Sequence, residues 1–281
     1  MKKFICILVS LLCFGFLFAQ SNDIVEGEYL IDDYKIEIGR NGDINIISYN
    51  GTNLDVVIPD NFDGYPVVSL SEFVFYENYN LKSVIVPSSV KIIPKGAFYK
   101  CTNLQSVTFG NSIEIIGEGA FYECTSLSSI VIPDSVVSIE SFSFYGCENL
   151  QSVVIGNNVQ IIDSCAFAYC SNLQSVTIGK SVKTIGNSSF LRCYNLTSII
   201  IPDSVTKIES KAFYGCSKLS SVVVGKNVEI LNFSFYFEGC PLLKKITLNS
   251  AETILFKVPE NIEIIIAKSL KEQMTDRNAG K

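Results

Sequence analysis

The sequence contains no histidine, and this absence excludes several kinds of active site at once. Ser-His-Asp and Cys-His pairs need an imidazole to accept the proton of the nucleophile, and many zinc sites use histidine ligands. Histidine is also the commonest general acid or base near neutral pH. The chain has no P-loop, no G-x-G-x-x-G and no G-x-S-x-G motif. We therefore expect no cofactor, and among common mechanisms only carboxylate chemistry stays open.

Positive charge is also in short supply. The chain has 22 Lys and Arg against 28 Asp and Glu, a net charge of −6. Loss of Lys2 and Lys3 with an N-terminal leader would lower this to −8. An acidic surface argues against nucleic acid and against anionic lipid as partners.

Long hydrophobic runs are absent after the first 19 residues. Lys2 and Lys3 precede an uncharged apolar run over residues 4–18, and Ala19 offers a small residue for cleavage. This pattern predicts a secretory signal peptide, residues 1–19, because the run is short for a membrane span. An N-terminal anchor helix is the alternative. Lipidation at Cys13 is disfavoured because bulky Leu11 and Leu12 precede it. We expect an exported mature protein that is secreted, periplasmic or on the cell surface, with no transmembrane segment.

Seven copies of one pattern follow each other at a fixed step of 23 residues. They begin at Leu81, Leu104, Leu127, Leu150, Leu173, Leu196 and Leu219. Each reads roughly L-x-S-[VI]-x-[VIF]-[PG]-x-[SN]-[VI]-x-x-I-x-x-x-[AS]-F-x-x-C-x-x, and LQSVTFGNSIEIIGEGAFYECTS (104–126) shows it clearly. A repeat of 20–29 residues that opens in this way is typical of a leucine-rich repeat solenoid, in which each unit buries its apolar face against its neighbours.

Within a copy, the leucine and the residues three and five positions later alternate with polar residues, which predicts a strand. Proline or glycine follows and ends it, as Pro133 and Gly156 do. Later in the copy, a phenylalanine precedes a cysteine by three residues, a spacing that suits one inward-facing helical turn. The phenylalanines should fill the core, and the tyrosines after them (Tyr99, Tyr122, Tyr145 and Tyr214) should lie half-buried on the convex side.

Ten cysteines suggest disulfides until their positions are considered. Six share one repeat position: Cys101, Cys124, Cys147, Cys170, Cys193 and Cys216. Cys240 follows with a slip of one residue, and Cys165 stands apart. We favour a ladder of buried free thiols. Disulfides between adjacent coils stay open because exported proteins normally pair their cysteines, and a metal site is disfavoured because no C-x-x-C pair exists.

The ends of the array depart from the pattern, as capping units do. Residues 20–52 form an N-terminal hairpin cap, with strands on either side of Asn41-Gly42. The repeats span residues 53–242, and the first, with a Gly-Tyr-Pro insertion (64–66), is degenerate. Residues 243–270 form a last partial repeat and C-terminal cap, and residues 271–281 a mobile tail.

The copies resemble the BspA-like, treponemal-type leucine-rich repeats, most closely in LSSIVIPDSVVSIESFSFYGCEN (127–149) and LTSIIIPDSVTKIESKAFYGCSK (196–218). The resemblance covers roughly residues 45–270. It implies a leucine-rich repeat solenoid of the α/β horseshoe class, mainly β with short helical turns and a parallel strand ladder on the concave face. It also implies surface adhesion for some members and no shared catalytic motif. This chain departs from the pattern by carrying glycine instead of proline in four copies.

Glycoside cleavage needs only two carboxylates, so an enzyme is not excluded by the absence of histidine. The candidates are Asp134 and Asp203 at one repeat position, and Glu140, Asp163 and Glu209 at another. Members of a column lie on different coils at corners, where acidic residues are usually solvated. We therefore expect no enzyme.

Residues two and four positions after each leucine should point outward from the strand ladder. One column is Ser83, Ser106, Ser129, Ser152, Ser175, Ser198 and Ser221, and the other is Ile85, Thr108, Val131, Val154, Thr177, Ile200 and Val223. An exposed strip of this kind is a candidate protein-binding face. Strand propensity and the small size of serine explain the same pattern without any ligand.

The sequence thus favours a secreted or cell-surface, non-enzymatic protein that binds another protein and mediates adhesion to host or neighbouring-cell proteins. The alternatives are a periplasmic or envelope scaffold without a host ligand and, more weakly, a carbohydrate-binding or hydrolytic surface. Surface accessibility on intact cells separates the first two, and glycan binding or sugar release would support the third.

Overall fold

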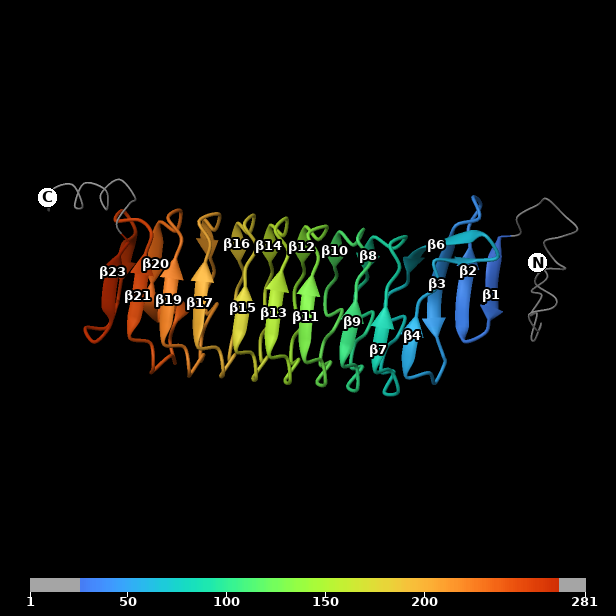
Figure 1. Cartoon of the computed structure of the whole chain (residues 1–281), viewed down its shortest axis with the longest axis horizontal. Helices are drawn as coiled ribbons and strands as arrows, with labels where there is room; N and C mark the ends of the chain where they lie inside the picture. The colour runs from blue at the N-terminus through green and yellow to red at the C-terminus, as the bar shows by residue number, and fades with distance from the viewer. Residues whose placement is uncertain (1–25, 268–281) are drawn as a thin grey trace, which may run out of the picture.

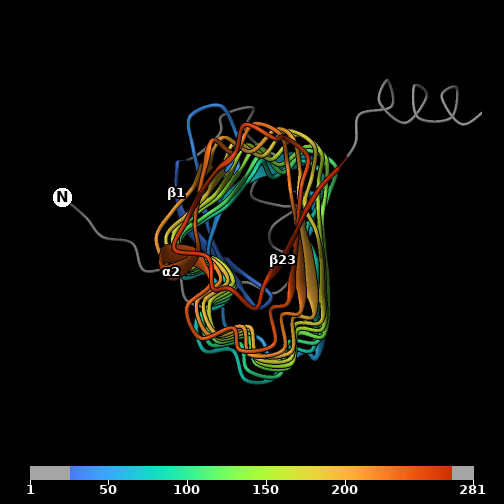
Figure 2. The ribbon, with the colours of Figure 1, turned by 90° about the vertical axis from the view of Figure 1, so that its left-hand side faces the viewer.

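Each 23-residue copy folds into one coil, and the coils stack in a nearly straight row in the computed structural model (Figure 1). The structure describes residues 26–267. The predicted signal peptide, with its expected cleavage after Ala19, and the expected tail lie outside these residues. Viewed along the row, the coils superpose around one central core (Figure 2).

One side of the row, which we call the strand face, is built from one parallel strand per coil. Its strands are β4 (Asp55–Val57), β7 (Ser83–Ile85), β9 (Ser106–Thr108), β11 (Ser129–Ile132), β13 (Ser152–Ile155), β15 (Ser175–Thr177), β17 (Ser198–Ile201), β19 (Ser221–Val224), β21 (Lys245–Leu248) and β23 (Glu263–Ile266). The seven repeat leucines before these strands are fully buried, as the 23-residue step predicts. Equivalent residues pair in register, for example Ser129 with Ser152 and Ser152 with Ser175.

The hydrogen-bonded pairing on the strand face stops twice, between β9 and β11 and between β15 and β17. At both places a coil with a glycine turn is followed by a coil with a proline turn: Gly110 by Pro133, and Gly179 by Pro202. Proline has no N–H to donate to the preceding coil and its ring needs space. The coils of β4 and β7 both have a proline turn, at Pro59 and Pro87, and these two strands remain paired. The pairing is therefore lost because a proline turn follows a glycine turn, and not because of proline alone. A single continuous ladder, which the unbroken repeat predicts, is therefore wrong at these two steps.

The glycine turns allow the coils to approach closely. A Cβ on Gly179 would lie 2.0 Å from the carbonyl oxygen of Gly156, and one on Gly156 would lie 2.3 Å from that of Pro133. Real Cβ atoms do not come so near to backbone oxygen, so only glycine fits at these positions. The sequence suggested that glycine permits a bend here, but close contact with the preceding turn is the structural reason.

A second side of the row carries short parallel strands in a continuous six-stranded sheet. They are β8 (Ile92–Ile93), β10 (Ile115–Ile116), β12 (Ser138–Ile139), β14 (Ile161–Ile162), β16 (Thr184–Ile185) and β18 (Lys207–Ile208). A separate pair, β20 (Ile230–Asn232) and β22 (Ile254–Phe256), follows.

The third side, the return arm, is not helical, which corrects the expected helical turn. Alternate amides bond to the next coil, as Phe98 N–H does to the Ala120 carbonyl, while those between them bond within their own coil. Each arm also contains left-handed residues such as Lys100 and Glu123, which an α-helix does not accommodate. The only helix of the described part is α2 (Phe233–Tyr236), which directly precedes Phe237, and that phenylalanine comes one residue later in its copy than in the others.

The return-arm phenylalanines form one column through the core. Eight rings stack from Phe75 to Phe237 with neighbouring centroids 5.0–5.5 Å apart and nearly parallel planes. Every ring is at most 1% exposed. The prediction that these residues form the core is confirmed.

An antiparallel sheet covers the N-terminal end of the row. It contains β1 (Gly27–Ile31), β2 (Tyr34–Ile38) and β3 (Ile44–Tyr49), and β2 pairs with β3 around the expected Asn41-Gly42 turn. The sequence did not indicate β1. The Gly-Tyr-Pro insertion joins β5 (Asn61–Phe62) to β6 (Tyr65–Leu70), and β6 pairs in parallel with β3, which connects the cap to the coils.

Candidate functional site

The strand face brings the two outward columns together as the sequence predicts. In the hydroxyl column, Ser106, Ser129, Ser175 and Ser198 are exposed and Ser83, Ser152 and Ser221 are half-buried. In the β-branched column, Ile85, Thr108, Val131, Val154, Thr177 and Ile200 are exposed and Val223 is half-buried. Val131 and Ile200 are 65% and 64% exposed. Neighbouring paired strands are about 4.8 Å apart, so the columns form a regular strip of hydroxyl and methyl groups.

The strip is longer than the predicted set. Val57 on β4 continues the β-branched column at one end, where it is 66% exposed. Thr247 and Ile265 continue it at the other end, in register with Val223. The signal was present in the degenerate copies, since Asp55-Val56-Val57-Ile58-Pro59 keeps the alternation of a strand. Asp55 also accepts a hydrogen bond from the Ser83 hydroxyl at 2.6 Å.

We call the two places where the strand pairing stops the openings. Apolar residues three and five positions after the leucine, which are buried in the other coils, are partly exposed there. Val107 and Phe109 on one side, and Val176 and Ile178 on the other, are only partly buried. Each pair belongs to the coil just before an opening. The order of glycine and proline turns was the available signal, because both openings occur where glycine is followed by proline.

The candidate carboxylates hold backbone amides and do not form an acid pair. Asp134 accepts a hydrogen bond from the Asn157 N–H at 2.6 Å, and Asp203 accepts one from the Lys226 N–H at 3.0 Å. The Lys226 amide and the Asn249 side chain lower the pKa of Asp203, since both donate to its carboxylate.

The second acidic column has the same role. Glu140 and Glu209 each accept a backbone N–H from the preceding coil, at 3.0 and 3.1 Å. Asp163 accepts the N–H of its own neighbour, Ser164, at 2.6 Å. All five carboxylates therefore accept backbone hydrogen bonds at turns, a structural role that involves no substrate.

The cysteine ladder is made of free thiols. All eight cysteines of the described part are unpaired, and every one except half-buried Cys165 is buried. Each of the seven ladder S–H groups donates to a phenylalanine carbonyl of the preceding coil at 3.0–3.2 Å, as Cys147 does to Phe121. Burial raises the pKa of Cys101 to about 12 and also raises that of Cys147. Thiols in this state are poor nucleophiles and poor metal ligands.

We expect thiol counting to reflect this arrangement. Under denaturing, non-reducing conditions, most of the eight cysteines of the described part should react with Ellman's reagent. In the native protein the ladder thiols should react far more slowly, because they are buried and protonated. Finding six or more of the eight oxidised in protein purified without reductant would contradict the assignment.

Tyrosines line the outer surface of the return arms. Tyr99, Tyr122 and Tyr145 are half-buried, as expected, and stack with centroids 4.7 and 4.8 Å apart. The ring faces therefore cover one another, and mainly edges and hydroxyls reach solvent. Tyr214, also half-buried, has the Lys211 ammonium 6.0 Å from its ring centroid.

Within residues 26–267, no three His, Cys, Asp or Glu side chains are grouped so that they could hold a metal ion. In the same residues no helix has the length and apolar character needed to cross a membrane.

Comparison with known proteins identifies the repeat. The BspA type leucine rich repeat region matches residues 68–196 and 137–262, in six copies. The chain belongs to this family, as its motifs predict. No curated protein matches the chain.

Several solved structures are similar to the chain. A leucine rich cell surface protein from Faecalibacterium prausnitzii A2-165 is 26% identical, with a TM-score of 0.64 over 88% of this chain and 78% of that one. A leucine-rich repeat protein of T. pallidum is 24% identical, with a TM-score of 0.41 over 91% of this chain and 97% of that one. A third, from Bacteroides ovatus ATCC 8483, is 22% identical, with a TM-score of 0.44 over 86% and 79%.

Proposed function

We propose that the protein is exported, displayed at the cell surface, and binds another protein through the strand face in an adhesive role without catalysis. The observation that carries this proposal is the exposed β-branched column, which runs from Val57 to Ile265 beside the hydroxyl column. The exposed apolar groups repeat over many coils and form one strip, and such patches are typical of interaction sites.

The two openings strengthen the proposal. A partner that lies along the strand face would also cover Phe109 and Ile178, which pack against the core and are only partly buried. The mid-array residues Ser129, Val131, Ser152, Val154, Ser175 and Thr177 lie between the openings. The outward columns of these strands have no aromatic or charged residue, so affinity from them alone should be modest.

Family membership supports the type of function. Repeat proteins of this kind present an extended surface, which suits binding more than catalysis. The F. prausnitzii relative is described as a cell surface protein, which supports display of this chain on the cell as well. The assignment of all five candidate carboxylates to backbone hydrogen bonds argues against the hydrolytic alternative.

Site-specific photo-crosslinking tests this function. A photoreactive residue replaces Thr177, which is exposed on the strand face, or Thr206, which is exposed away from it. The chain without its leader is irradiated on intact cells of neighbouring or host type, and adducts are identified by mass spectrometry. We expect protein adducts from position 177 and not from position 206. Adducts from 206 alone would refute the site.

Display is tested separately. An epitope tag on the protein in its own cells should be labelled by antibody before permeabilisation. Labelling only after permeabilisation would favour the envelope scaffold.

A further inference from the structure

Apolar side chains of the last strands are exposed at the C-terminal end of the described chain. Leu248 occupies a core position of β21 and is 2% exposed, whereas Ile266, its register partner on β23, is 53% exposed. Ile264 and Leu255, whose equivalents Ile246 and Leu231 are fully buried, are also partly exposed. Figure 2 views the molecule from this end, with β23 and α2 in front. No further coil of the described chain covers these side chains.

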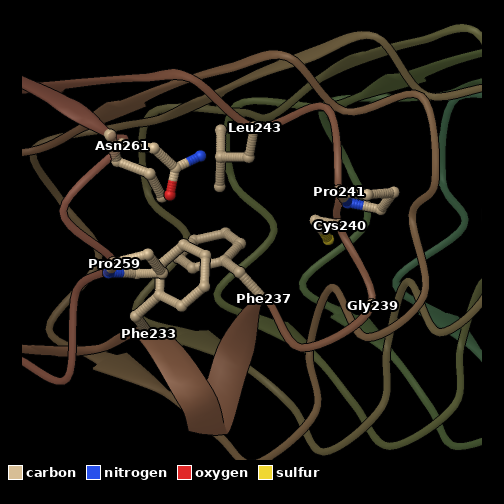
Figure 3. Close-up of a pocket in the computed structure, with 9 residues that line it drawn as sticks. Phe233, Phe237, Gly239, Cys240, Pro241, Leu243, Pro259 and Asn261 are labelled. Atoms are coloured by element: carbon tan, nitrogen blue, oxygen red, sulfur yellow. The ribbon is translucent and has the colours of Figure 1, made fainter.

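A cavity of about 280 Å³ lies at the same end. Its lining is mostly apolar and consists of Phe233, Phe237, Gly239, Cys240, Pro241, Leu243, Pro259, Asn261 and Ile262 (Figure 3). Phe237 is the last ring of the phenylalanine column, which has no further member to stack on it. The cavity thus lies where the core of a following coil would be.

At the N-terminal end, by contrast, the core is covered and the outer edge is charged. Ile36 and Ile38 of the antiparallel cap are fully buried. The outer edge of the cap carries ion pairs, Lys35 with Glu28 at 2.7 Å and Arg40 with Glu26 at 2.9 Å. Solenoids need a polar outer face on the terminal unit to stay soluble, and these ion pairs contribute to one at the N-terminal end.

The backbone of β23 is also available on its outer side. Glu263 and Ala267 donate their N–H groups inward, to Lys244 and Leu248. In a parallel ladder, alternate residues bond to the same neighbour. The N–H groups of Ile264 and Ile266 therefore point away from β21, towards the open edge, which can pair with another strand.

We propose that a second copy of this chain covers the C-terminal end, so that two solenoids join tail to tail. The segment 268–281 contains two large apolar side chains, Leu270 and Met274, among mostly polar and charged residues. This composition favours another occupant, and removal of the segment tests that choice. The N-terminal cap is charged at its edge, whereas β23 of another copy offers the same exposed isoleucine and the same open backbone edge, so it matches.

Antiparallel pairing of the two β23 strands would bury the exposed isoleucines and pair the free backbone groups of both strands. A two-fold axis at Ile265 places Ile264 opposite Ile266 of the second copy, so that both isoleucines face the cores and exchange their free backbone hydrogen bonds. Glu263 then lies opposite Ala267, and no like charges meet directly. Because the interface is the same on both copies, assembly closes at the dimer.

The test measures mass by light scattering and dissociation by sedimentation, on residues 20–281. We expect a mass about twice that of one chain at high concentration. Ile265→Arg places two guanidinium groups on the axis and should raise the dissociation constant more than tenfold. Ile266→Lys should do the same, and each variant must keep the circular dichroism spectrum of the parent. Ile200→Arg, at an exposed isoleucine of the strand face, is the matched control and should leave the dimer intact.

Removal of residues 268–281 distinguishes a second copy from this segment as the cover of the C-terminal end. The shortened chain should remain dimeric. A monomeric parent that dimerises only after this truncation would assign the end to the segment itself and overturn the proposal. A monomer in both forms, or growth into open-ended oligomers that Ile265→Arg does not affect, would overturn it equally.

Discussion

Replacing Phe144 by alanine should lower the free energy of unfolding by about 3–5 kcal/mol. Phe144 is fully buried and stacks between Phe121 and Phe167, with centroids 5.0 and 5.1 Å away. The substitution leaves a cavity in the middle of the column, and the coils on both sides are held by backbone hydrogen bonds, so they cannot close it. Urea unfolding followed by circular dichroism measures the change.

Phe142 provides the matched control because it is a phenylalanine of the same coil but is exposed to solvent. Phe142→Ala should cost less than about 1 kcal/mol, because little apolar area is removed from the core. Equal losses for the two variants would contradict the central role of the stacked rings.

The second large effect concerns a glycine. Gly179→Ala should destabilise the protein by about 2–3 kcal/mol, which is the upper part of the range for overpacking. Its Cβ would lie 2.0 Å from the carbonyl oxygen of Gly156, a backbone atom that cannot move without opening the ladder between β13 and β15. The same urea titration measures it.

Gly39→Ala is the control, because the nearest atom to its added Cβ is 3.7 Å away, an ordinary contact distance. Its effect should stay within about 0.5 kcal/mol. If Gly179→Ala is as mild as Gly39→Ala, glycine is not required by close coil contact, and the explanation of the turns is wrong.

The repeat period was enough to predict the buried columns. A leucine, a phenylalanine and a cysteine that recur every 23 residues must stack on their own equivalents, so their burial follows from the sequence. The outward residues, such as Val131 and Thr177, followed from the two-residue period of a strand. Their placement needed no knowledge of the turns.

Features that depend on the contact between two different coils could not be read from one copy. The openings beside Phe109 and Ile178 arise from the order of glycine and proline turns, which is a property of neighbours. The left-handed residues of the return arm, such as Lys100 and Glu123, carry no distinctive side chain that marks them. The role of Glu140 depends on an amide of the preceding coil, 22 residues away in sequence.

The exposure of the C-terminal end also could not be predicted from the sequence. Residues 262–270 read as a closing strand of the cap, and β23 (Glu263–Ile266) lies within that range. Whether anything covers it depends on the rest of the coil, where the pattern of apolar residues is lost. Exposure of Ile266 is therefore visible only in three dimensions.

The central claim, that the strand face binds a protein, is tested most directly by the double substitution Val131→Glu and Val154→Glu. Both valines are exposed, so the buried columns stay intact and circular dichroism should be unchanged. Binding of the partner identified by crosslinking is measured by surface plasmon resonance, against the control Val137→Glu with Ile161→Glu, which alters exposed residues away from the strand face. The account predicts a loss of affinity of more than tenfold, about 1.4 kcal/mol or more, for the strand-face variant and little change for the control. Unaltered binding by the folded strand-face variant would contradict it.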